Sequence, residues 1–168
     1  MKQPAWYQRF GRRLKPADRY YERGLYYYER GKFDLAVADL DEAITLAPKK
    51  AEYYVARGLM LIDYNQPAEA AEDLAVALEM DPTQWLAHYG SGVLAVDDGE
   101  YQDAIRHFSR AQRLAPRRPE IYFYRAVALY YAGQNDEAIR DMSFVLTLLE
   151  QGDRRRKDAE HWLTLFRE

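Results

Sequence analysis

Arginine and aspartate recur in the sequence at a fixed separation that would let them form ion pairs. Each of three arginines is followed by an aspartate 16 residues later, giving the pairs Arg23–Asp39, Arg57–Asp73 and Arg125–Asp141. A planar guanidinium binds a carboxylate through two parallel hydrogen bonds. Such pairs fix the register of packed helices more than they stabilise them, because desolvation of the charges offsets much of their attraction. We therefore expect a structural role for these pairs.

The sequence has no arrangement of residues that is typical of an enzyme or a metal site. It contains no Cys, and its histidines lie at unrelated places, which are His88, His107 and His161. Phosphate-binding loops and the G-x-S-x-G and H-E-x-x-H motifs are absent. The adjacent acids Asp97 and Asp98 are interpreted as a solvated helix end before Gly99, not as acid/base catalysts. We expect no catalysis, no cofactor and no metal ion.

Composition and charge exclude further classes of protein. The 168 residues are 48% hydrophobic and 30% charged, as in one ordinary domain with a core of its own. Residues 1–16 carry five Lys or Arg and no acid, whereas residues 17–152 carry 14 basic and 23 acidic groups. An acidic body lacks the basic stripe that nucleic acids need. Without a membrane-spanning run or a signal peptide, we expect a cytoplasmic protein.

The elements that position these residues repeat with a period of 34 residues. Alanine keeps this interval without exception, at Ala36, Ala70, Ala104 and Ala138. Glycine and proline keep it three times each, at Gly24, Gly58 and Gly92 and at Pro48, Pro82 and Pro116. Each copy predicts two short amphipathic helices, at 18–30 and 34–47 in the first, with a turn at Gly31–Lys32 between them. The third copy lacks the arginine–aspartate pair and has Ser91 and His107 there.

The first copy, residues 17–50, resembles a tetratricopeptide repeat. It matches the signature of that family at Tyr20, Gly24, Tyr27, Gly31, Phe33, Ala36, Leu40, Ala43 and Pro48. Four consecutive repeats are predicted, at 17–50, 51–84, 85–118 and 119–152. The resemblance implies an all-α fold, a right-handed α-solenoid of four tetratricopeptide helix pairs.

The two ends of the chain lie outside these repeats. Residues 153–168 predict a C-terminal capping helix with Asp153 as its N-cap. An apolar stripe on that helix would cover the last repeat, and consists of Ala159, Trp162, Leu163 and Phe166. Residues 1–16 form a basic aromatic N-terminal arm, which contains Trp6, Tyr7, Phe10 and Leu14.

The family resemblance also implies a binding groove, because the first helix of each tetratricopeptide repeat lines a concave surface. The candidate groove residues are Tyr21, Leu25, Tyr28, Glu52, Val55, Leu59, Ile62, Tyr89, Val93, Val96, Glu120, Phe123, Tyr124, Val127, Tyr130 and Tyr131. Lys and Arg are absent from this set. Family members that hold the C-terminal carboxylate of chaperones use Lys, Asn and Arg at such places, so the carboxylate-binding use is excluded. An alternative that stays open is that part of this lining packs between repeats.

The predicted function is a non-catalytic protein–protein interaction scaffold. Its groove would bind a peptide or helix of a protein partner that offers apolar side chains and positive charge. The alternatives are a nucleic-acid-associated protein that uses the basic arm, and a structural subunit of a larger enzyme assembly. The arm has the chemistry of a groove ligand, so self-association through residues 1–16 is a hypothesis. A terminus or short helix that covers the first repeat is the simpler interpretation of the arm.

Overall fold

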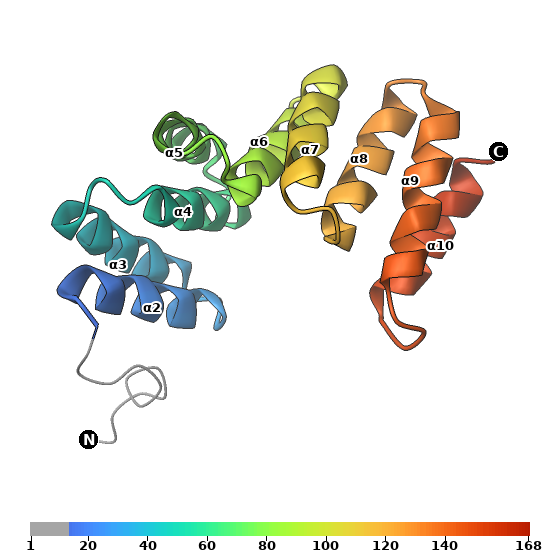
Figure 1. Ribbon diagram of the computed structural model, residues 1–168. Helices are drawn as coiled ribbons and strands as arrows, with labels where there is room; N and C mark the ends of the chain where they lie inside the picture. Colours follow the sequence, from blue (N-terminus) through green and yellow to red (C-terminus); the bar gives the residue numbers. More distant parts are fainter. Residues whose placement is uncertain (1–13) are drawn as a thin grey trace. The chain divides into compact units, whose positions relative to one another are not determined.

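The computed structural model describes residues 14–168, which form helices joined by short turns (Figure 1). The helices are α2 (Pro16–Tyr28), α3 (Phe33–Leu46), α4 (Ala51–Asp63), α5 (Pro67–Met80), α6 (Trp85–Asp97), α7 (Tyr101–Leu114), α8 (Pro119–Tyr131), α9 (Asn135–Leu148) and α10 (Arg155–Leu165). No strand occurs in this part of the chain. The predicted all-α fold of helix pairs followed by a C-terminal helix is confirmed. Residues 1–13 of the predicted arm lie outside the described residues.

The chain divides into two compact bodies, Met1–Ala87 and His88–Glu168, here called the N-terminal and C-terminal bodies. In the N-terminal body α2 packs against α3, α3 against α4 and α4 against α5. In the C-terminal body α7 packs against α8, α8 against α9 and α9 against α10. No helix in the described part of the chain is long and apolar enough to cross a bilayer.

The turn within each helix pair uses one residue in the left-handed backbone conformation. This residue recurs every 34 positions, as Gly31 (φ 67°), Asn65 (φ 60°), Gly99 (φ 76°) and Gly133 (φ 78°). The next amide N–H then reaches back to a carbonyl of the first helix, as from Lys32 to Tyr27 at 3.0 Å. Glycine and asparagine are the residues that adopt this conformation most readily. The first helix of each of the four pairs therefore ends in the same type of turn.

A second set of glycines lets the two helices of a pair approach closely. A Cβ atom built on Gly92 of α6 would lie 2.7 Å from the nearest ring carbon of Phe108 on α7. At Gly58 of α4 the same atom would lie 3.0 Å from Cγ of Leu74 on α5. Phe108 and Leu74 are fully buried. The second helix therefore occupies the volume that a side chain on the first would need.

The last helix, α10, completes the core of the C-terminal body. Its residues Ala159 and Leu163, with Phe166 directly after the helix, belong to the same buried cluster as Met142 of α9. Phe166 stacks on Tyr130 of α8 with ring centroids 4.9 Å apart. The predicted covering role of the apolar stripe agrees with this packing.

The start of α10 differs from the prediction in one detail. The helix begins at Arg155 and has Arg154 at its N-cap position, so Asp153 lies one residue before the N-cap and does not occupy it. The Asp153 carboxylate still accepts a hydrogen bond from the backbone N–H of Arg155, at 2.9 Å. It thus satisfies one of the amides that a helix start leaves without an intrahelical partner.

The close approach at Gly92 generates a testable prediction. Replacement Gly92→Ala should lower the free energy of unfolding by about 1–3 kcal/mol, because the packed core cannot accommodate another methyl group without strain. Gly152→Ala is the matched control, since no atom lies within 4 Å of the added Cβ. Urea denaturation followed by circular dichroism measures both. Equal stability of Gly92→Ala and the parent chain would contradict the close packing of α6 on α7.

Candidate interaction site

The predicted arginine–aspartate pairs are present and link the two helices of a repeat. Arg57 of α4 donates from Nε and Nη2 to the two carboxylate oxygens of Asp73 on α5, at 2.7 and 2.6 Å. The same two-bond geometry joins Arg23 to Asp39 and Arg125 to Asp141. Asp73 is 5% exposed, and its hydrogen bonds raise the pKa of Arg57 above the usual arginine value. Each pair is thus a hydrogen-bonded contact in which the aspartate is largely shielded from water.

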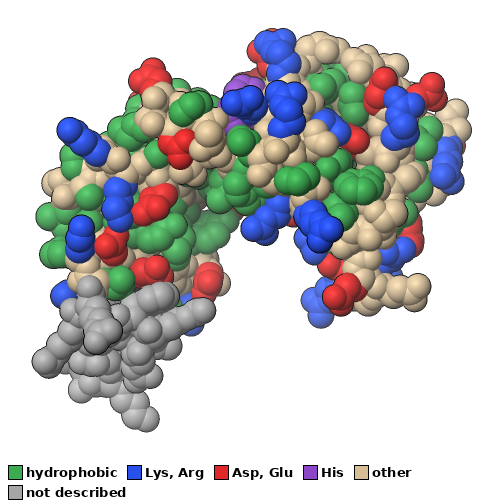
Figure 2. Space-filling model, in the orientation of Figure 1, with side chains coloured by type: hydrophobic (Ala, Val, Ile, Leu, Met, Phe, Trp, Pro, Cys, Tyr) green, Lys and Arg blue, Asp and Glu red, His purple; other side chains and the backbone are tan. Residues whose placement is uncertain are grey.

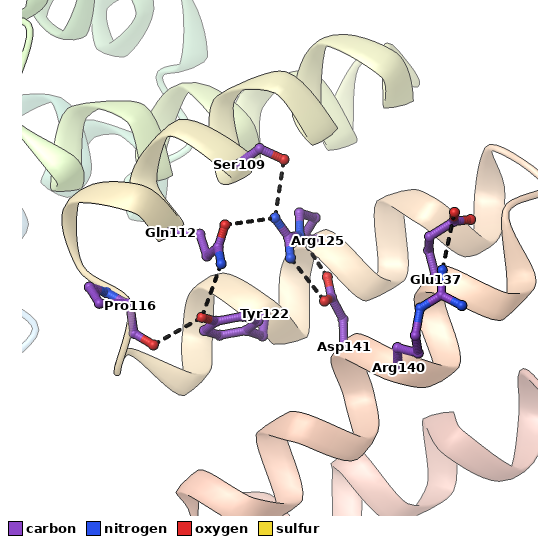
Figure 3. A network of polar contacts seen from close by, with 8 residues as sticks. All are labelled: Ser109, Gln112, Pro116, Tyr122, Arg125, Glu137, Arg140 and Asp141. Carbon is purple, nitrogen blue, oxygen red and sulfur yellow. Dashed lines mark hydrogen bonds and ion pairs between the residues drawn. The ribbon is translucent and has the colours of Figure 1, made fainter.

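Each of these arginines makes contacts beyond its aspartate. The Arg125 guanidinium lies 5.5 Å from the ring centre of Tyr122, and its Nη1 donates to Ser109 of the preceding helix α7 at 3.1 Å (Figure 3). Arg57 reaches Asp41 of α3 at 2.5 Å in the same way. Arg57 and Arg125 therefore tie their own repeats together and fasten each to the preceding repeat. Its donors are used by protein groups, which agrees with a structural role.

The third repeat replaces this contact with two histidines. His88 of α6 and His107 of α7 face each other with their Nδ1 atoms 3.5 Å apart. Burial, followed by the positive charge that His88 can carry, lowers the pKa of His107. Both side chains are half-buried. The expectation that the histidines lie at unrelated places is therefore wrong for these two, because the helix pair brings them together.

A groove in the N-terminal body gathers several of the predicted groove residues. It has a volume of about 200 Å³ and is walled by α2, α4 and the start of α6. The lining residues are Tyr21, Leu25, Tyr28, Glu52, Val55, Ala56, Leu59, Met60, Gln84 and Leu86. Glu52 is the one charged residue among these described lining residues. We call this cavity the N-terminal groove.

The electrostatics of the N-terminal groove are set by acids. Burial, and then the negative charges of Glu52 and Glu22, raise the pKa of Tyr21. Burial and a hydrogen bond to Asp63 raise the pKa of Tyr28 to about 12, so its hydroxyl stays protonated and donates to that carboxylate. A ligand in this groove therefore meets neutral aromatic surface within a negative field.

The lysine next to Glu52 does not offset this field. Lys50 Nζ lies 2.5 Å from Asp18 Oδ1 and 3.3 Å from Glu52. Tyr53 donates a hydrogen bond to the same oxygen of Asp18, at 2.5 Å. The hydrogen bonds from Lys50 and Tyr53 lower the pKa of Asp18, which keeps this carboxylate ionised. The charge of Lys50 is thus balanced within the protein.

A second cavity lies in the C-terminal body, between the last helix pair and α10. Its volume is about 190 Å³, and its lining consists of Pro119, Glu120, Phe123, Tyr124, Val145, Leu149, Arg155 and Asp158. Arg155 is bound to Asp153 at 2.6 Å. The lining is mainly apolar and includes the charged residues Glu120, Arg155 and Asp158. Figure 2 shows hydrophobic side chains at the surface of both bodies, interspersed with charged groups.

The sequence model of the tetratricopeptide repeat family matches residues 21–84 and 89–142, which is more than half of the chain. The chain belongs to the tetratricopeptide repeat family. Proteins of this family bind protein partners and are generally non-catalytic. No curated protein matches the chain.

Solved tetratricopeptide repeat structures share the fold at low sequence identity. A crystal structure of MamA matches with a TM-score of 0.70 and 20% identity, over 93% of this chain and 88% of that one. MamA of Desulfovibrio magneticus RS-1 gives 0.76 and 19%, over 89% and 82% of the two chains. PilF of Pseudomonas aeruginosa gives 0.78 and 20%, over 89% and 67%. Identities this low establish the likeness of fold alone.

The structure distributes the predicted groove residues of the tetratricopeptide repeats among different surroundings. Six of them line the N-terminal groove, namely Tyr21, Leu25, Tyr28, Glu52, Val55 and Leu59. Three line the second cavity, namely Glu120, Phe123 and Tyr124. Neither cavity includes Ile62, Tyr89, Val93, Val96, Val127, Tyr130 or Tyr131 among its described lining residues.

Packing accounts for several of the residues outside the cavities. Val127 is 8% exposed and belongs to the buried cluster that includes α10. Tyr130 stacks on Phe166, and Tyr89 packs edge-on against Tyr124. Tyr131 is 53% exposed and stacks on Tyr101. These are packing contacts, as in the alternative in which part of the predicted lining packs between repeats.

Sequence reasoning missed lining residues that lie outside the periodic first-helix positions. Met60 enters the N-terminal groove from the buried side of α4, and Gln84 from the turn before α6. Arg155 reaches the second cavity from α10, which is not part of any repeat. The histidine pair did have a sequence signal, because His88 and His107 stand 34 residues after Tyr54 and Asp73.

The buried ion pairs generate a second prediction. Asp73→Ala should lower the free energy of unfolding by about 2–3 kcal/mol, since it leaves the largely buried guanidinium of Arg57 with Asp41 as its remaining carboxylate partner. Replacing both partners, Arg57→Met with Asp73→Leu, should cost less than Asp73→Ala. Chemical denaturation of the single and double variants measures the coupling.

An exposed ion pair of the same protein provides the control. Glu137 and Arg140 lie 3.2 Å apart with side chains 52% and 67% exposed (Figure 3). Glu137→Ala should change the free energy of unfolding by less than about 1 kcal/mol, because water solvates both groups. Additive effects of the Arg57 and Asp73 replacements would show that the two side chains are not energetically coupled.

Proposed function

We propose that this protein is a non-catalytic scaffold that holds a segment of a protein partner in the N-terminal groove. The segment would carry apolar side chains beside lysine or arginine. The observation that carries the proposal is the lining of the groove, which consists mainly of aromatic and aliphatic side chains and has Glu52 as its charged residue. Membership of a family that binds protein partners supports the general role.

Charge complementarity favours a basic ligand for this groove. Residues 17–84, which form both repeats of the N-terminal body, carry seven Lys and Arg against fourteen Asp and Glu. Arg57, the one basic residue of the second repeat, is bound by two carboxylates. A positively charged segment would therefore be attracted before contact and would find no like charge in the lining.

The shape of the groove suits side chains rather than a small molecule with several polar groups. Tyr21 and Tyr28 give rigid contact area from α2, and Leu59 faces the same space from α4. Rigid aromatic side chains lose little conformational entropy on binding. A leucine or phenylalanine of the partner could fill the apolar space while a neighbouring arginine lies near Glu52.

The N-terminal arm of the chain supplies a probe of suitable chemistry. Residues 1–16 contain five basic residues and three aromatic residues without an acid. Binding of this arm to the groove, either of its own chain or of a second copy, stays a prediction. A carboxylate ligand has no support in the lining, and the nucleic-acid and enzyme-assembly alternatives gain none from the described residues.

A binding experiment with this probe tests the proposed function. A labelled peptide with the sequence of residues 1–16 should bind the protein, as measured by fluorescence anisotropy, and should bind more weakly as salt rises. Leu59→Arg should weaken binding by about tenfold or more, because it places a like charge in the apolar lining. Binding is compared for the full chain and for a chain begun at Leu14, whose own arm cannot compete.

Two controls make the outcome specific. Leu46→Arg introduces the same charge on α3, at a side chain that is 51% exposed and outside the groove lining, and should leave binding unchanged. A peptide in which every lysine and arginine is glutamate should not bind. If Leu59→Arg and the parent chain bind the basic peptide equally well, the groove is not its site.

A further inference from the structure

The third repeat departs from the others at the place where each of them holds its arginine. The other repeats have a tyrosine and an arginine on the first helix and an aspartate on the second. All three positions change together in the third repeat, where the residues are His88, Ser91 and His107. A loss of the ion pair alone would not require a histidine on both helices. The paired replacement indicates a different contact between the same two helices.

The two histidines meet across the third helix pair. Their Nδ1 atoms are 3.5 Å apart. A hydrogen bond donated by a nitrogen normally spans about 2.7–3.2 Å. Two imidazole nitrogens at about 2.0–2.1 Å from one tetrahedral zinc ion lie about 3.4 Å from each other. The observed separation is longer than a typical hydrogen bond but still within reach of one, and it also matches that of two nitrogens that share a metal ion.

We propose that the third repeat binds a divalent late transition-metal ion, such as Zn²⁺ or Ni²⁺, between Nδ1 of His88 and Nδ1 of His107. Imidazole nitrogen is a preferred ligand of these ions. The ion would join α6 to α7 as the guanidinium of Arg57 joins α4 to α5. In both cases a positive charge lies between the two helices of a repeat.

The surroundings limit the site to two protein ligands. No group of three or more His, Asp or Glu side chains that could hold a metal ion occurs among the described residues. Asp103, one helical turn before His107, is bound to Arg106 at 2.5 Å. Water would complete the coordination, and it can reach the site because both histidines are half-buried. Binding is therefore expected to be weaker than at a four-ligand structural zinc site.

Metal-dependent stability of the full-length, untagged chain tests this proposal. Thermal unfolding should shift to higher temperature when ZnCl₂ or NiCl₂ is added, because an ion that binds the folded state alone stabilises it. Isothermal titration calorimetry should give one ion per chain. MgCl₂ at the same concentration should have no effect, because Mg²⁺ prefers oxygen ligands.

A combined variant separates metal binding from folding. His88→Tyr, Ser91→Arg and His107→Asp together install the residues of the other repeats, so this chain should fold and lose the response to Zn²⁺ and Ni²⁺. His161→Ala, on α10, should keep the full response. An unchanged unfolding temperature of the parent chain with metal would overturn the proposal. A response that persists in the combined variant, or that disappears in His161→Ala, would overturn it as well.

Discussion

The close contact between the two helices of each repeat is the constraint on which the rest of the structure depends. Gly58 and Gly92 leave room for a large side chain of the second helix, Leu74 or Phe108, against the backbone of the first. The left-handed turn residues, such as Asn65 and Gly99, return the chain at the spacing that this contact requires. Once this spacing is set, the polar side chains on the two helices come within reach of each other.

The polar contacts between the two helices are alike in the first, second and fourth repeats and differ in the third. An arginine such as Arg57 meets its aspartate and the preceding helix with several donors, so it leaves little of its charge to a ligand. The N-terminal groove contrasts with this, because it exposes aromatic and aliphatic surface next to Glu52. The ion pairs and the lining of the proposed binding groove thus use different residues of the same first helices.

The repeat period was sufficient to predict the arginine–aspartate contacts within a helix pair. The interval of 16 residues placed Arg57 opposite Asp73 because both helices have nearly constant length and the turn is always the same. Groove residues were harder to predict, since the rule for first helices takes no account of the helix after the last repeat. Val127 and Tyr130 occupy groove positions by that rule, yet they pack with α10 because this extra helix covers the end of the array.

The arginine contacts have a consequence for the way the chain folds. Arg57 reaches Asp73 and Asp41, which are each 16 residues away along the chain. Loops of this length close at a modest cost in chain entropy, and proteins built from such local contacts fold quickly. In a repeat array, folding can begin in one helix pair and spread to its neighbours. A chain emerging from the ribosome could therefore complete one repeat, and then attach the next through its arginine, before synthesis ends.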